Sequence, residues 1–182
     1  MNAIISVSDK KNLDKLCNFL NIKNYNLYCS GGTYKYLEKE NIKNIYKIED
    51  LVQQKELLNG RVKTLHPHIH AGILADRENE EHMKDIRENN IKLIDLIVVN
   101  LYPFKKVVDE KGSEDELIEN IDIGGHTLIR AGCKNHKYVS VLTNPLDYED
   151  DWVKIVIEPY TILISNIFRR TCSLYFFSYN IY

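Results

Sequence analysis

The sequence predicts an α/β fold with a mostly parallel sheet flanked by helices, and two observations support this prediction. Apolar runs of roughly four to six residues, rich in Ile and Val, alternate along the chain with stretches of helical period. The chain has 182 residues, of which 44% are apolar and 27% charged, as in an average globular domain. This length provides a sizeable core and excludes two full catalytic domains.

The expected elements follow one another in a regular order. The apolar run AIISV predicts a strand at 3–7, before a helix at 9–20, and NLYC predicts a strand at 26–29, before a helix at 33–40. NIYKI predicts a strand at 44–48, before a helix at 78–89. LIDLIVV predicts a strand at 93–99, before helices at 114–120 and 126–134, and YVSVL predicts a last strand at 138–142. No internal repeat or low-complexity linker interrupts this order.

The pattern changes near the C-terminus. Residues 153–182 carry only four charges, and aromatic residues gather at their end. We therefore expect one domain at 1–148 and an atypical segment at 149–182. Three interpretations of this segment stay open: a partner-binding extension, a pair of core strands, and a truncated or frameshifted end. The lack of clear caps and turn residues favours the last.

The charge balance excludes one class of function. Lys and Arg total 24 against 26 for Asp and Glu, so the formal charge is −2. Proteins that bind duplex nucleic acid usually have a basic excess, so we expect no nucleic-acid partner. A small anionic ligand needs only a local positive pocket, which this balance permits.

The cysteines and the N-terminus indicate a cytoplasmic protein. Cys17, Cys29, Cys133 and Cys172 form no C-x-x-C pair and no zinc-knuckle spacing, so we expect reduced thiols. The N-terminus shows no secretory signal, and no uncharged run is long enough to span a membrane.

Two polar loops follow the first two predicted strands, where ligands bind in an open α/β sheet. Free N–H groups at a helix N-terminus, glycines and hydroxyls together form an anion cradle. Ordinary capping is the alternative for either loop alone, but two such loops favour a phosphate-bearing ligand. The loops contain Ser8, Asp9, Lys10, Ser30, Gly31, Gly32 and Thr33.

A third candidate segment is GRVKTLHP at 60–67, which lacks the spacing of a Walker A loop. An extended chain places Arg61 and Lys63 on one face. Arg61 is suited to clamp phosphate oxygens and Lys63 to stabilise an oxyanion. A solvated cationic turn is the alternative.

His66, His68 and His70 alternate, so on a strand they would share one side in a metal-ligand geometry. No acidic ligand follows nearby, and residues 71–74 have the character of packing residues. We therefore disfavour a metal site.

Further polar residues follow the fourth predicted strand and precede a late helix. Asn100 and Tyr102 place an amide and a phenol at the end of the strand, although a half-buried tyrosine is the alternative. Asp122 precedes the helix at 126–134, where a capping role is the alternative. Lys134 lies twelve residues after Asp122, so only a folded helix brings it back toward that carboxylate.

Six ordered blocks carry a family resemblance: SVSDK at 6–10, SGGT at 30–33, GRVKTLHP at 60–67, NLYPF at 100–104, ENIDIGG at 119–125 and KNH at 134–136. With them the chain resembles the IMP cyclohydrolase domain of the bifunctional AICAR transformylase/IMP cyclohydrolase family. The resemblance covers about residues 3–148, ends after about Tyr148, and leaves the transformylase domain absent. It implies a methylglyoxal-synthase-like, Rossmann-like three-layer fold. His126 departs from the family, which often has a small apolar residue or proline there.

The resemblance also implies an activity: closure of 5-formamidoimidazole-4-carboxamide ribotide (FAICAR) to IMP with loss of water. It implies no metal, no organic cofactor, and a homodimer whose small-molecule partners are purine nucleotides. Lys63 would stabilise an oxyanion, Asp122 would orient or deprotonate the amide, and Tyr102 and Lys134 would relay protons. The implied substrate-binding residues are Ser8, Asp9, Lys10, Ser30, Gly31, Gly32, Thr33, Arg61, Val62, Thr64, Asn100, Ile123 and Gly124. A non-catalytic phosphate- or nucleotide-binding module and an inactive fragment are the alternatives.

Overall fold

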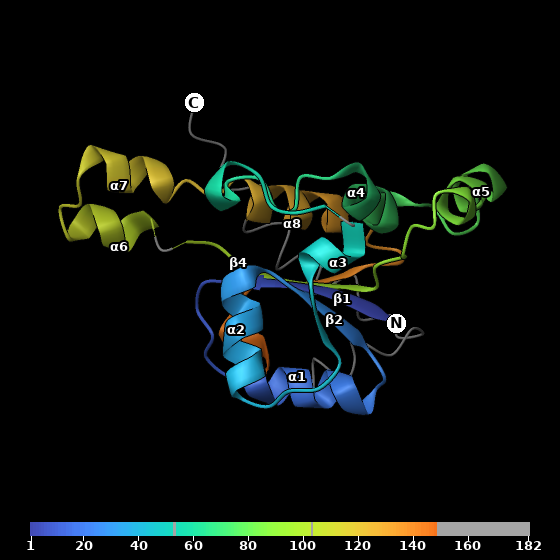
Figure 1. The fold of residues 1–182 in the computed structure, drawn as a ribbon, viewed down its shortest axis with the longest axis horizontal. Helices are drawn as coiled ribbons and strands as arrows, with labels where there is room; N and C mark the ends of the chain where they lie inside the picture. Colours follow the sequence, from blue (N-terminus) through green and yellow to red (C-terminus); the bar gives the residue numbers. More distant parts are fainter. Residues whose placement is uncertain (53, 103, 149–182) are drawn as a thin grey trace.

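A computed structural model describes residues 1–52, 54–102 and 104–148 of the chain. Its centre is a parallel sheet of five strands in the order β3-β2-β1-β4-β5 (Figure 1). This confirms the predicted α/β fold with a parallel sheet. The predicted segment at 149–182 lies outside the described residues. The strands are β1 (Asn2–Val7), β2 (Asn26–Cys29), β3 (Ile45–Lys47), β4 (Leu96–Asn100) and β5 (Ser140–Leu142).

The strand order creates a switch point at β1. The chain runs outward from β1 through β2 to β3, then returns to place β4 on the other side of β1. Ile4 of β1 therefore pairs with Tyr28 on one side and Ile97 on the other. In such sheets the crevice for a ligand opens beyond the carboxyl ends of the strands at this switch point.

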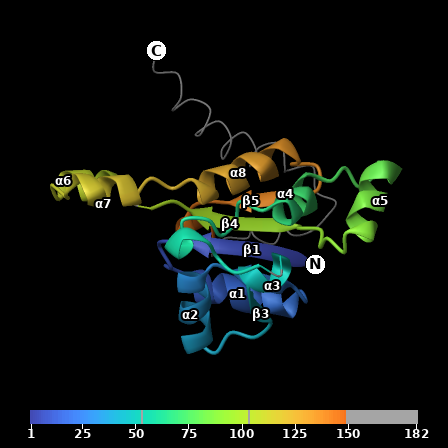
Figure 2. The same cartoon turned by 45° about the horizontal axis from the view of Figure 1, so that its top comes forward.

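Helices cover both faces of the sheet, which gives three layers. Figure 2 shows α4 (Pro67–Leu74) and α8 (Gly124–Lys134) above the sheet and α1 (Leu13–Ile22) and α2 (Gly31–Lys39) below it. Successive strand side chains point to opposite faces, so Ile5 packs with Leu16 of α1, whereas Ile4 packs in the cluster that contains Leu128 of α8. Strands β1, β2 and β4 are buried on both sides, so their sequences are nearly continuously apolar, whereas the edge strand β3 has exposed side chains at Tyr46 and Lys47.

Several predicted boundaries differ from the observed ones, for local reasons. Helix α1 begins at Leu13 and not at residue 9, because Asn12 has a left-handed φ of 60°. Strand β4 begins at Leu96 and not at residue 93, because the carbonyl groups of Leu93 and Ile94 accept hydrogen bonds from side chains instead. Helices α2 and α8 each begin two residues earlier than predicted, at glycines.

Five short helices were not predicted. Among them, α4 overturns the interpretation of the alternating histidines: His66 caps it by accepting from the N–H of His68, and Pro67 occupies its first position. His68 and His70 therefore lie on a helix, where residues two apart point in different directions. In the described part of the chain, no group of three His, Cys, Asp or Glu side chains is arranged for a metal ion. The other four are α3 (Ile48–Val52), η1 (Leu58–Gly60), α6 (Phe104–Asp109) and η2 (Pro145–Tyr148).

Two predicted helices are present with shorter bounds, α5 (Glu80–Glu88) and α7 (Glu114–Glu119). Helix α7 starts with a capping box, in which Ser113 and Glu116 exchange side-chain and backbone hydrogen bonds. Helices α6 and α7 pack together and project beyond the sheet as an arm in both views (Figures 1 and 2). The arm ends where the chain enters α8.

Two cysteines of the described residues agree with the expectation of reduced thiols. Cys17 and Cys29 are free and buried, and burial raises the pKa of the Cys29 thiol to about 12. Within the described residues, no helix has both the length and the apolarity to cross a membrane.

Candidate functional site

A cavity of about 660 Å³ opens beyond the carboxyl ends of the strands. Its walls come from the segments that follow β1, β2 and β4, from the loop at 59–65, and from the end of α7 through the start of α8. This is the place that the strand order predicts for a ligand.

The structure brings together thirteen of the seventeen residues that sequence analysis assigned to the site. These are Ser8, Lys10, Ser30, Gly32, Thr33, Arg61, Lys63, Thr64, Asn100, Tyr102, Asp122, Ile123 and Gly124. Asp9, Gly31, Val62 and Lys134 are not among the lining residues. The lining also includes residues that were not assigned, Ser6, Asn59, Leu65 and Glu119 among them. Ser6 and Glu119 lie within the quoted blocks at 6–10 and 119–125, so the blocks were a signal for them.

The loop after β1 is held from β4 by Asn100. Its side-chain oxygen accepts hydrogen bonds from the backbone N–H groups of Ser8 and Asp9, at 2.7 and 2.8 Å. These two N–H groups are therefore not free for an anion. The loop presents instead the Lys10 ammonium, which donates to the carbonyl of Ser8 at 3.2 Å and lines the cavity. At this loop the group available to an anion is therefore the Lys10 side chain and not the predicted backbone N–H groups.

The loop after β2 has the features of a backbone anion site. Ser30 precedes α2 and makes no side-chain cap, so its hydroxyl does not occupy the first N–H groups of the helix. This end of the helix borders the cavity, because Ser30, Gly32 and Thr33 line it. The Ser30 hydroxyl lies 3.1 Å from that of Ser6 and 3.3 Å from that of Thr33. Thr33 is buried and also bonds the backbone of Val7, which ties α2 to the end of β1. A rigid row of hydroxyls therefore borders the helix N-terminus.

The loop at 57–65 forms the outer wall. Leu57 and Val62 pair across it, and Gly60 between them has a φ of +89°, which favours glycine. A Cβ at Gly60 would lie 2.7 Å from the Cε atom of Lys63, so the glycine also makes room for the lysine stem. The loop places both Arg61 and Lys63 on the cavity.

Helix α8 contributes its N-terminus. Asp122 accepts a hydrogen bond from the N–H of Gly125 at 2.7 Å, so the capping role considered for this residue is present. A Cβ at Gly124 would lie 2.5 Å from the Oγ1 atom of Thr64, which shows how closely the helix approaches the loop. The carboxylate of Asp122 thus has a fixed position on the cavity wall.

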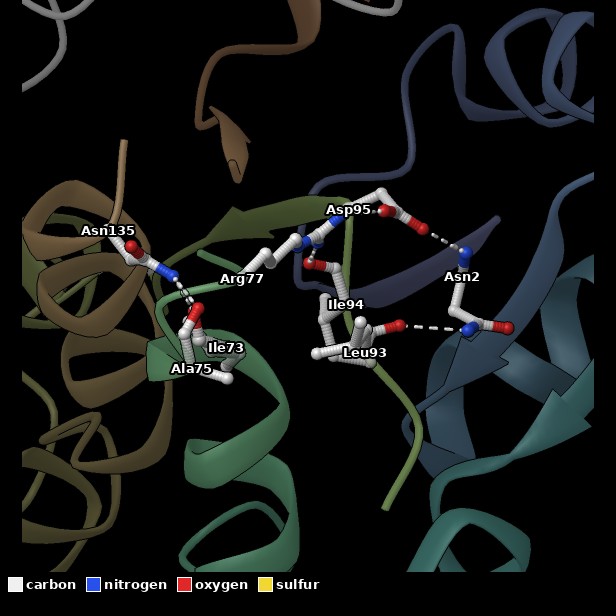
Figure 3. A network of polar contacts seen from close by, with 8 residues as sticks. All are labelled: Asn2, Ile73, Ala75, Arg77, Leu93, Ile94, Asp95 and Asn135. Carbon is white, nitrogen blue, oxygen red and sulfur yellow. Dashed lines mark hydrogen bonds and ion pairs between the residues drawn. The ribbon is translucent and has the colours of Figure 1, made fainter. Parts of the chain in front are cut away.

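Within this chain, helix α8 does not bring Lys134 back toward Asp122. Lys134 is the last residue of α8, about 15 Å along the helix from its N-terminus. The next residue, Asn135, donates to the carbonyl groups of Ile73 and Ala75 and anchors that end of the helix to α4 (Figure 3). Because α8 runs away from the cavity, the Lys134 amine is exposed on the far side.

Electrostatics concentrate positive charge in the cavity. Lys10, Arg61 and Lys63 line it, against the carboxylates of Glu119 and Asp122. Arg61 and Glu119 form an ion pair at the mouth. Such a lining suits a small ligand with an anionic group at one end and polar groups at the other.

The base of the 57–65 loop rests on the capped end of α4. Burial first, and the neighbouring His68 second, lower the pKa of His66. Burial also lowers the pKa of His70, and a hydrogen bond to the backbone of Thr64 partly offsets this effect. Burial therefore favours the neutral form of both imidazoles, next to the segment that carries Lys63.

Comparisons with known proteins agree with this architecture. The bifunctional purine biosynthesis protein PurH of Prochlorococcus marinus (strain MIT 9215) is 53% identical over 150 residues, which are 81% of this chain and 29% of that protein. PurH of Thermoanaerobacter sp. (strain X514) is 49% identical over 148 residues, again 81% of this chain and 29% of that protein. The chain thus spans less than a third of the length of these relatives.

A solved structure and a family model extend the comparison. The crystal structure of ForH superposes with a TM-score of 0.79 at 31% identity, over 98% of this chain and 93% of that chain. The family model described as MGS-like domain matches residues 12–127. The chain therefore belongs to the MGS-like domain family and is related to the corresponding region of PurH.

Proposed function

We propose that the cavity binds a purine nucleotide and that the chain closes FAICAR to IMP with loss of water. The observation that carries this proposal is the convergence of Lys10, Lys63, Tyr102 and Asp122 on one cavity beside the N-terminus of α2. The relation to PurH, whose name states purine biosynthesis, supports the purine class of the ligand.

The phosphate end of the ligand is proposed to lie at α2. Free N–H groups at a helix N-terminus and nearby hydroxyls stabilise a bound phosphate, and Ser30 and Thr33 supply the hydroxyls. Lys10 adds a full positive charge from the loop after β1, and Arg61 adds a second one from the 57–65 loop. Together these groups fix one end of the nucleotide and leave its base toward α8.

The reacting groups are proposed to lie between the 57–65 loop and α8. Attack of the carboxamide nitrogen on the formyl carbon creates an oxyanion, which the Lys63 ammonium is placed to stabilise. The proton of the amide then has to leave and a hydroxyl has to depart as water, so the step needs proton carriers. Asp122 and Tyr102 are the proposed carriers. Holding both reacting groups of one substrate together lowers the barrier further.

The other assigned residues keep narrower roles in the proposal. Asn100 and Asp9 shape the loop after β1, and Thr64, Ile123 and Gly124 form the wall beside the base. Gly31 contributes through the helix N-terminus, and Val62 through its pairing with Leu57. No role is assigned to Lys134 inside the cavity of its own chain.

A second candidate is a binding module without catalysis. The hydrogen bond from Gly125 to Asp122 favours it, because a capping carboxylate is already in use as a structural acceptor. Such a module would bind IMP and FAICAR but would not interconvert them.

Turnover distinguishes the two candidates. We expect the purified chain to form IMP from FAICAR, followed by absorbance, and Lys63→Met to abolish this activity. Asp122→Asn keeps the cap acceptor and removes the charge, so a loss of turnover with retained IMP binding assigns the carboxylate to the chemistry. IMP binding without turnover in the unmodified chain favours the module, and neither binding nor turnover contradicts both.

We also propose that the chain acts in the cytoplasm as a homodimer and needs no metal or organic cofactor. The relation to PurH supports the assignment to a biosynthetic enzyme. Sedimentation equilibrium tests the dimer, and turnover in the presence of EDTA tests the independence from metal.

A further inference from the structure

The ion pair between Arg61 and Glu119 joins two parts of the cavity mouth that lie 58 residues apart in the sequence. Arg61 follows η1 in the 57–65 loop, and Glu119 is the last residue of α7. Both side chains line the cavity. The pair therefore connects the outer wall with the projecting α6–α7 arm.

The loop that carries Arg61 is a short hairpin, and its tip is held by local backbone hydrogen bonds from the Gly60 N–H to the Leu57 carbonyl and from the Arg61 N–H to the Leu58 carbonyl, both at 3.1 Å. Leu57 and Val62 close it with two backbone hydrogen bonds, of 3.0 and 3.2 Å. Leu58 and Asn59 both have a φ of 52°, which side chains other than glycine rarely adopt. The Leu58 side chain is 71% exposed, so burial does not hold the tip in place. The ion pair is thus an external restraint on this loop.

Charge competition follows from the position of the pair. The Arg61 guanidinium is the group best suited to clamp a phosphate in a bidentate manner, but it already faces a carboxylate. Lys10 and Lys63 are the other two cations of the lining. An anion that enters the cavity must compete with Glu119 for Arg61, and it must also approach the negative charge of Glu119.

We propose that Glu119 is a specificity-determining residue that occupies Arg61 in the empty cavity and yields it to an anionic group of the ligand. The inference rests on the proposed function, since it requires a phosphate-bearing nucleotide. When the ligand replaces Glu119 as the partner of Arg61, the end of α7 is released from the 57–65 loop and Arg61 contacts the ligand. Weakly anionic ligands do not displace Glu119, so the pair discriminates by charge.

The expected effect is modest, because both side chains are more than half exposed, at 62% for Arg61 and 56% for Glu119. Exposed ion pairs contribute up to about fivefold to an equilibrium constant. Removal of the competing carboxylate should therefore tighten the binding of a nucleotide monophosphate about two- to fivefold.

A double-mutant cycle tests the proposal. The dissociation constant of IMP is measured by calorimetry for the unmodified chain, Glu119→Gln, Arg61→Gln and the double variant. Glu114→Gln serves as the matched control, because Glu114 also lies on α7 but does not line the cavity. We expect Glu119→Gln to bind IMP about two- to fivefold more tightly, and the same substitution to have a smaller effect once Arg61 is glutamine.

Two kinds of result would overturn the proposal. Unchanged or weaker binding by Glu119→Gln contradicts the competition. Equal tightening by Glu119→Gln in the presence and absence of Arg61, or by Glu114→Gln, shows general charge repulsion in place of a specific pair. If IMP binds the unmodified chain and only the cycle fails, the proposed function stands; if IMP does not bind at all, both fail.

Discussion

The side-chain amide of Asn100 and the backbone of Asp9 form a reciprocal pair of hydrogen bonds. The Oδ1 atom of Asn100 accepts from the Asp9 N–H at 2.8 Å, and its Nδ2 atom donates to the Asp9 carbonyl at 2.7 Å. The same oxygen accepts from the N–H of Ser8. A residue at the end of β4 thus fixes the loop after β1, which carries Lys10 into the cavity.

We expect Asn100→Ala to loosen this loop and to weaken IMP binding. Loss of the amide removes partners from three backbone groups, at a cost of about 1–3 kcal/mol in the free energy of unfolding. Hydrogen exchange of the Ser8 and Asp9 amides should accelerate, which nuclear magnetic resonance measures residue by residue. Asn100→Asp is the control that keeps the acceptor and loses only the bond to the Asp9 carbonyl. Unchanged protection of both amides in Asn100→Ala would contradict the clamp.

A second prediction concerns the amino ends of β1 and β4, at the opposite end of the strands from the cavity. There, Asp95 accepts from Arg77 at 2.9 Å and from the backbone N–H of Asn2 at 2.7 Å, while Arg77 also donates to the carbonyl of Ile94 (Figure 3). Both charged side chains are largely buried. Asp95→Ala leaves two donors without their acceptor, so we expect a loss of about 2–3 kcal/mol in urea unfolding.

Asp95 does not line the cavity, so Asp95→Ala should leave IMP affinity in the folded chain unchanged. Glu78→Ala removes an exposed pair with Lys137 and should cost less than about 1 kcal/mol. Similar losses of unfolding free energy in Asp95→Ala and Glu78→Ala would mean that burial does not determine how much an ion pair stabilises this fold.

The centre of the sheet was predictable because β1 and β4 are buried on both faces. Ile4 and Ile5 point to opposite layers and are both fully buried, so the whole run must be apolar. Helix α4 was not predictable from periodicity, because its alternating histidines have the spacing of a strand. The helix is determined instead by the Pro67 start and the His66 cap, which act through the backbone.

The site was predictable in its loops and not in its long-range contacts. Ser30 follows from a motif next to a predicted strand and Lys63 from the cationic segment at 60–67, and both line the cavity. The Arg61–Glu119 pair joins segments that only the tertiary structure brings together, and a carboxylate at a helix end resembles any solvated residue. Lys134 was assigned to the site, but it lies at the far end of α8 from Asp122, and the length of the helix separates the two residues.

A third prediction is a decrease in stability at acid pH that depends on His66. The folded chain holds His66 with a pKa below its usual value, because of burial and the nearby His68. The unfolded chain therefore binds more protons as the pH falls through about 6.5, and stability present above that pH is lost below it. Protonation also removes the acceptor for the His68 N–H.

Urea unfolding between pH 7.5 and 5.5 measures this effect. His66→Asn supplies a cap acceptor that does not titrate, so its stability should fall less over the same range. The pKa of His70 is lowered too, so some dependence of stability on pH should remain in His66→Asn. The same slope in His66→Asn as in the unmodified chain would exclude His66 as the source.

A fourth prediction tests the contact between α8 and the 57–65 loop. Gly124→Ala would place a Cβ 2.5 Å from the buried Thr64 hydroxyl, so the loop has to shift outward. We expect a cost of about 1–3 kcal/mol in unfolding, as for overpacked cores, together with weaker IMP binding. The double variant with Thr64→Ala removes the clash and should recover stability relative to Gly124→Ala. If the double variant is no more stable than Gly124→Ala, the loss of stability does not come from the contact with Thr64.

The last prediction concerns Lys134, which the family resemblance assigns to the reaction and the structure places at the far end of α8. Because its amine does not line the cavity, Lys134→Ala should bind IMP within about twofold of the unmodified chain, whereas Lys63→Ala should bind more weakly. Calorimetry on both variants measures this difference. A tenfold loss of affinity in Lys134→Ala would mean that the amine reaches a cavity by another route. Mixing Lys134→Ala with Lys63→Ala then tests one such route, because activity returns only if one copy supplies its Lys134 to the cavity of another.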